Sequence, residues 1–144
     1  DWKERIRALA FPLGDRLQYD EYHEYDNSAP ALVDYDGIIY GHYVGSGAYG
    51  NALSTKHHGA SLVDKLARSA TVGHSHKLHY FRKADARPTP ITGLVAGCFK
   101  GADEAWAGQA NREWSKGVVV KKYVENGDYD FSWVSMSALQ KEYG

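Results

Sequence analysis

The sequence has little cysteine and no long apolar run. Cys98 is the only cysteine among 144 residues, which excludes an intrachain disulfide and a zinc site built from several thiolates. No apolar run approaches the ~20 residues that a membrane-spanning helix needs, so we expect no membrane partner. The chain starts at Asp1 without a signal-peptide pattern.

The sequence also lacks an excess of charge of either sign and the common nucleotide-binding motifs. The formal net charge is −1, which gives no indication of a basic nucleic-acid surface. Glycines follow one another closely at positions 45, 47 and 50, but the phosphate-cradle pattern G-x-x-x-x-G-K-[ST] and the dinucleotide-binding spacing are both absent. We therefore interpret this glycine-rich stretch as a loop at the end of a strand.

What remains is the composition of an ordinary globular domain. Hydrophobic residues make up 43% and charged residues 24% of the chain, and its length suits a single domain over residues 1–144. β-branched and aromatic runs predict strands at 37–44, 70–72, 77–83, 91–99, 117–125 and 129–134. Asn126-Gly127 predicts a hairpin between the last two. Apolar spacing predicts helices at 1–10, 61–68 and 137–143, and residues 51–55 are interpreted as the start of another helix that Gly59 ends.

Two Gly-His pairs stand at the ends of predicted strands. Gly73-His74-Ser75-His76 follows strand 70–72, and Gly41-His42 lies near the end of strand 37–44. Neutral imidazole is a common ligand of zinc, iron and manganese. If the two strands are parallel neighbours, their carboxyl ends lie side by side, and we expect His42, His74 and His76 to converge. Taken alone, a His-x-His pair is more often structural or at the surface than metal-binding, and His42 alone also suits a strand histidine hydrogen-bonded in the core. We expect His57 and His58 to lie elsewhere.

These motifs resemble those of the calcineurin-like metallophosphoesterases. Residues 72–77 are similar to the terminal Gly-His-x-His motif of that family, and residues 40–43 to its preceding metal-histidine motif. Residues 93–99, Trp114 and residues 117–119 resemble the corresponding stretches of phage and bacterial members. The resemblance implies a two-sheet sandwich flanked by helices and a centre of two divalent metal ions (Mn, Fe or Zn) that hydrolyses phosphate esters. It also implies that His42 and His74 bind one ion and His76 the other.

The same resemblance implies motifs that the sequence lacks. There is no Asp-x-His, Gly-Asp-x-x-Asp or Gly-Asn-His motif. The opening residues resemble the segment that follows Gly-Asn-His in phage-type members, so Asp1 would be the last residue of that motif. We therefore expect a partial α/β domain whose catalytic residue and bridging carboxylate precede Asp1. Asp1 and Gly73 are expected to lie next to the metal ligands without binding the ions themselves.

Two functions follow as expectations. The first is a metal-dependent phosphoesterase of a bacterial or phage-infected cytoplasm, inactive as this chain alone, whose substrate is a phosphate ester. A nucleic-acid substrate is compatible with that chemistry but is not indicated by the charge of −1. The alternative is a non-enzymatic phage or bacterial module that binds a protein through aromatic segments, residues 19–25 and 106–114. Stoichiometric bound metal would favour the first, and a metal-free protein with a peptide ligand the second.

Overall fold

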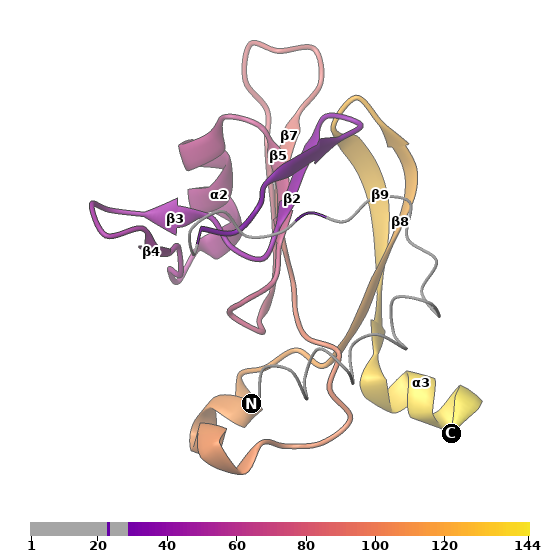
Figure 1. Cartoon of the computed structure of the whole chain (residues 1–144). Coiled ribbons are helices and arrows are strands. Elements are labelled where there is room, and N and C mark those ends of the chain that lie inside the picture. The colour runs from indigo at the N-terminus through magenta and orange to yellow at the C-terminus, as the bar shows by residue number, and fades with distance from the viewer. Residues whose placement is uncertain (1–22, 24–28) are drawn as a thin grey trace.

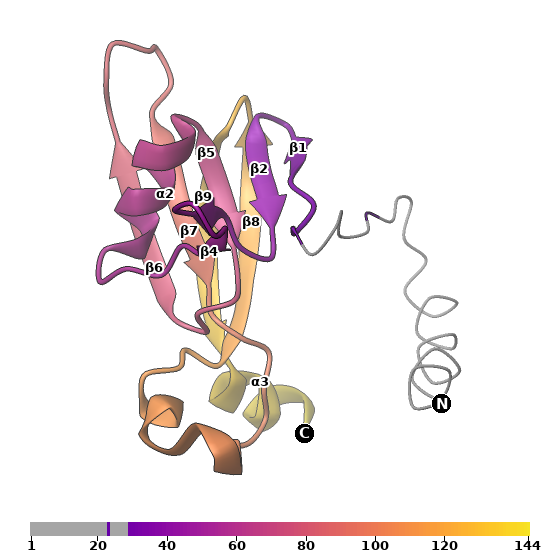
Figure 2. The same ribbon diagram turned by 60° about the vertical axis from the view of Figure 1, so that its left-hand side comes forward.

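The computed structural model describes residue 23 and residues 29–144 (Figure 1). The helix expected at residues 1–10 and the role expected for Asp1 lie outside the described residues. The described chain forms an α/β structure in which a five-stranded sheet is covered on one face by helix α2 and on the other by a two-stranded hairpin (Figure 2). Within the described residues, no helix is both long and apolar enough to cross a membrane.

The sheet has the order β1-β2-β5-β7-β6. Its strands are β1 (Val33–Tyr35), β2 (Ile38–Gly41), β5 (Ser69–Val72), β6 (Leu78–Lys83) and β7 (Ile91–Ala96). The three central strands β2, β5 and β7 are parallel, and the two edge strands pair antiparallel with their neighbours. Gly41 is the register partner of Val72, so β2 and β5 end side by side. The prediction that the two Gly-His strands are parallel neighbours is confirmed.

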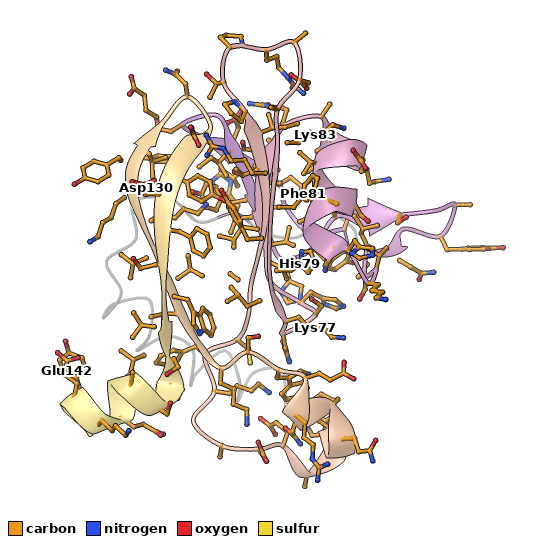
Figure 3. The ribbon with its side chains drawn as sticks, turned by 180° about the vertical axis from the view of Figure 1, so that it is seen from behind. Lys77, His79, Phe81, Lys83, Asp130 and Glu142 are labelled. Atoms are coloured by element: carbon orange, nitrogen blue, oxygen red, sulfur yellow. The ribbon has the colours of Figure 1, made fainter. Side chains whose placement is uncertain are left out.

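Helix α2 (His58–Leu66) covers one face of this sheet. Its Leu62 and Val63 are fully buried, and they belong to an apolar layer completed by Val44, Leu53, Ala70, Val72 and Val95. The side chains of β6 point alternately to the two faces of the sheet. Figure 3 shows His79 and Phe81 on the face that α2 covers. Lys83 projects from the same side and forms an ion pair with Asp64 of α2, with 2.7 Å between Nζ and Oδ1.

The second layer is a hairpin of β8 (Gly117–Glu125) and β9 (Asp128–Ser135), joined at Asn126-Gly127 as predicted. Tyr129 of this hairpin is buried against Ile38 and Leu94 of the sheet. This hairpin faces the five-stranded sheet, so the predicted sheet-on-sheet arrangement is present (Figure 1). The remaining elements are the 3₁₀ helix η1 (Ala105–Arg112) and the final helix α3 (Met136–Tyr143), which matches the helix predicted at 137–143.

Two local predictions are wrong. Residues 51–55 do not begin a helix, because Asn51–Ala52 forms strand β4 and pairs with β3 (Gly45–Ser46) in a small hairpin. Gly59 does not end a helix but lies in the first turn of α2, which begins three residues before the predicted start at residue 61. Gly59 lies inside the helix because α2 packs closely on the sheet there. A Cβ atom built on Gly93 of β7 would lie 2.0 Å from the carbonyl oxygen of Gly59. The helix can approach the sheet this closely only where both residues are glycine.

Candidate functional site

His42 and His74 meet at the carboxyl ends of β2 and β5. The Nε2 atom of His42 lies 2.9 Å from the Nδ1 atom of His74, and the ring centroids are 5.0 Å apart. The backbone joins the same two segments, because the amide of Gly73 donates to the carbonyl of His42 over 3.1 Å. The ring of Tyr43 packs against that of His74 with 5.1 Å between centroids. The predicted convergence is therefore confirmed for this pair.

The loop that carries His74 and His76 has an unusual backbone. Both residues have positive φ angles, 61° and 58°, which non-glycine residues adopt infrequently. The amide of Ser75 donates to the carbonyl of Gly73 over 2.8 Å, which stabilises the tight turn between the two histidines. Residues kept in such conformations occur often at ligand sites, where surrounding contacts offset the cost. The turn makes a His-x-His pair diverge from the common face that a strand would give it.

His76 lies against Trp114 at the edge of this loop. The two ring centroids are 4.5 Å apart, and the planes are nearly perpendicular at 83°. The next residue after Trp114 secures the arrangement, since the amide of Ser115 donates to the carbonyl of His76 over 2.8 Å. The hydroxyl of Ser115 accepts a hydrogen bond from the amide of Leu78 over 2.9 Å. Trp114 therefore contacts the side chain of His76, and Ser115 binds the backbone of His76 and Leu78.

His58 was predicted to lie away from this loop, and that prediction is wrong. It is the first residue of α2, and its side chain is 4% exposed. Its Nδ1 lies 3.3 Å from the hydroxyl of Ser75, between the two loop histidines. Its Nε2 is buried and has no hydrogen-bond partner among the described residues. His57 is exposed, so only one of the two adjacent histidines reaches the loop.

The pKa values of three of these rings are lowered from the ordinary histidine value. Burial lowers the pKa of His58, with further lowering by His79 and His74. Burial is also the main cause of the lowered pKa of His74, with His42 second. For His76, burial and then the positive charge of Lys100 lower the pKa most. These rings are therefore neutral at pH 7, which is the form of imidazole that binds metal ions.

Gly73 does not need to be glycine for steric reasons. A Cβ atom built there would meet only the carbonyl oxygen of His42, at 3.9 Å, which is an ordinary contact distance. The strained positions are the two histidines that follow it.

The predicted group of three ligands is not found: among the described residues, His42, His74 and His76 are not placed to hold one metal ion together. The described residues contain no group of three or more His, Cys, Asp or Glu side chains placed to hold a metal ion. Asp34 lies in β1 and pairs with Arg68, next to the start of β5, which is the end of the sheet opposite the histidines. Comparisons with protein-family models, with curated proteins and with solved structures each find no match for this chain.

Proposed function

We propose that the protein supplies the histidine ligands of a metal-dependent phosphoesterase. The observation that supports this most directly is the 2.9 Å separation of His42 Nε2 and His74 Nδ1 at neighbouring strand ends. Two imidazole nitrogens bound to one zinc ion in a tetrahedral site, each at about 2.0–2.1 Å, would lie about 3.3 Å apart, so one ion would need only a small rotation of the two rings. His76 follows two residues later and would serve the second of two ions, Mn, Fe or Zn.

The chemistry assigned to such ions is Lewis-acid activation of a water and of a phosphate ester. The protein would hold the neutral imidazole rings of the three histidines in place at the carboxyl ends of β2 and β5. The hydrogen bond from Gly73 to His42 joins the two strand ends, and the contacts of Trp114 and Ser115 fix His76. Because three neutral rings offset none of the charge of two divalent ions, these residues account for only part of the ligand set.

Isothermal titration of the 144-residue protein with Mn²⁺ and Zn²⁺ tests this function. We expect weak binding of one ion, and we expect His42→Ala and His74→Ala each to abolish it. His57→Ala is the matched control, since His57 is exposed and lies between β4 and α2, outside the proposed ligand pair. Unchanged metal affinity in His42→Ala and His74→Ala would refute the assignment. Absence of metal binding together with specific peptide binding would favour the non-enzymatic alternative.

A further inference from the structure

An aromatic cluster lies directly beside His76. It consists of Trp106 in η1, Trp114 after η1, and Lys100, and we call these three residues the indole platform. The two indole rings are 5.6 Å apart between centroids and are tilted by 56°. The ammonium of Lys100 lies 5.7 Å from the Trp106 ring and 5.0 Å from the Trp114 ring. The platform is contiguous with the candidate metal site, because Trp114 contacts the ring of His76.

The segment that carries the platform is held in place by its own hydrogen bonds. Asn111 exchanges two bonds with the backbone of Glu104, at 2.9 Å and 2.8 Å, which closes the loop around η1. The amide of Cys98 donates to the carbonyl of Ser115 over 2.9 Å and joins the two ends of the segment. Figure 1 shows that the segment between β7 and β8, which carries these rings, lies at the same end of the molecule as the loop between β5 and β6.

The core of the protein does not require this exposed indole. Trp106 is 74% exposed, although tryptophan usually contributes to a core through its large apolar area. The other strongly exposed aromatic of the segment is Phe99, at 73%. The remaining exposed aromatics belong to other elements, among them Tyr35 in β1 and Tyr123 in β8. A stable protein interface needs roughly 800 Å² on each partner, so a patch of two indoles fits a small planar ligand better than a protein surface.

The charges around the platform favour a ligand with one or a few phosphates. Three lysines of this region are each paired with a carboxylate: Lys100 with Glu104, Lys77 with Glu113, and Lys116 with Asp103. In the part of the chain that the structure describes, this pairing leaves no extended positive surface of the kind that a long duplex needs around the platform. Lys100 still has donors beyond the one that Glu104 accepts, and it lies over both rings. Aromatic faces with a nearby cation bind bases of any sequence by stacking.

We propose that the indole platform stacks the base of a nucleotide whose phosphate ester lies at His42, His74 and His76. Trp114 contacts the ring of His76, so a base stacked on the platform would lie next to one of the proposed ligands. The substrate class is therefore a nucleoside phosphate or the end of a single strand. This inference rests on the proposed phosphoesterase function for the place of the phosphate, but base stacking can be measured without catalysis.

The test uses the indole N–H signals of the protein in NMR spectra. Four tryptophans are present, and Trp133 of β9, which packs against Gly97 and Gly117 and is not part of the platform, is the internal reference. We expect adenosine 5′-monophosphate to shift the Trp106 and Trp114 signals saturably, and ribose 5-phosphate to leave them in place. Trp106→Ala should weaken nucleotide binding about tenfold, the size of one lost stacking contact. Tyr35→Ala is the matched control, an exposed aromatic at the opposite end of the sheet, and should bind as the wild type does.

The outcomes separate the two proposals. Equal binding of ribose 5-phosphate and the nucleotide, or unchanged affinity in Trp106→Ala, would overturn the platform even if Mn²⁺ binds. Nucleotide-dependent shifts in a protein that binds no metal would support the platform and refute the phosphoesterase. A short single-stranded DNA that binds more tightly than the mononucleotide through the same indoles would identify a strand end as the substrate. A peptide that moves these signals where the nucleotide does not would replace the nucleotide with a protein partner.

Discussion

The imidazole of His58 lies 3.3 Å from the hydroxyl of Ser75 and thereby connects the start of α2 to the histidine loop. Because His58 is 4% exposed, its position is fixed by the layer between helix and sheet. The loop residues on both sides of Ser75 have left-handed backbones, so an external support is needed to keep them there. We infer that the buried ring positions the loop that carries the proposed ligands.

Ser75→Ala should weaken metal binding more than it weakens the fold. The variant removes the hydroxyl that faces His58 without leaving a large cavity. Loss of a hydrogen bond of this kind behind metal ligands typically costs about tenfold in metal affinity. The measurement is titration with Mn²⁺ together with urea unfolding, and we expect a change of less than about 1 kcal/mol in the free energy of unfolding. Equal metal affinity in Ser75→Ala and the wild type would show that the contact does not position the ligands.

His58→Ala should destabilise the protein directly. Truncation of a buried ring at the helix–sheet layer removes apolar contacts and leaves a cavity, at an expected cost of about 2 kcal/mol. The matched variant His57→Ala changes an exposed neighbour and should stay within about 0.5 kcal/mol of the wild type. Urea unfolding monitored by circular dichroism measures both variants. Equal free energies of unfolding in the two variants would show that the buried His58 ring does not contribute to the stability of the protein.

Acid should destabilise the protein in the range where histidines titrate. The pKa values of His58, His74 and His76 are lowered in the folded protein, mainly by burial. The unfolded chain then binds more protons than the folded chain below pH 6.5, so stability is full above about pH 6.5 and decreases as the pH falls through the lowered values. Urea midpoints between pH 7.5 and 5 should show this decrease. The urea midpoint should fall less steeply with decreasing pH in His58→Ala. An unchanged pH dependence in that variant would contradict the role of the His58 ring.

A second titration is expected on the alkaline side. Lys121 of β8 lies between the two sheets, with its Nζ 3.0 Å from the hydroxyl of Tyr40 and 2.6 Å from that of Thr71. Burial lowers its pKa to about 8 from an ordinary value of 10.5. The folded protein therefore releases this proton before the unfolded chain does, and stability should rise with pH from about 8 upward.

The measurement for Lys121 is the urea midpoint between pH 7.5 and 9. The upper limit avoids the thiol of Cys98, whose pKa is raised by burial from 9.0. Lys121→Met should remove the rise, since no ammonium remains to be discharged. Lys122→Met alters the exposed neighbour and should retain it. A rise of equal size in both variants would assign the titration to another group.

The sequence predicted those strands and turns whose conformation follows from the local preferences of their residues. The runs around Ile38, Val72 and Ile91 form strands because β-branched residues suit the extended backbone, and Asn126-Gly127 makes the hairpin turn. The strand-end Gly-His pairs were enough to predict that His42 and His74 meet. The role of His58 was not predictable, because it depends on which turn of α2 faces the loop. That placement is set by the contact of Gly59 with Gly93, which are far apart in the sequence.

The glycine contact provides a final contrast between two positions that look alike in the sequence. Gly93 lies in β7, and a Cβ atom there would be 2.0 Å from the carbonyl oxygen of Gly59, a backbone atom that cannot rotate away. Gly73 lies one residue after β5, where a Cβ atom would meet nothing nearer than 3.9 Å. Gly93→Ala must push α2 away from the sheet, which should cost about 3 kcal/mol through lost packing around Leu62. Gly73→Ala should stay within about 0.5 kcal/mol and keep its metal affinity. Thermal and urea unfolding of the two variants measure the difference, and similar stabilities would show that the close approach of α2 to β7 does not determine the packing of this layer.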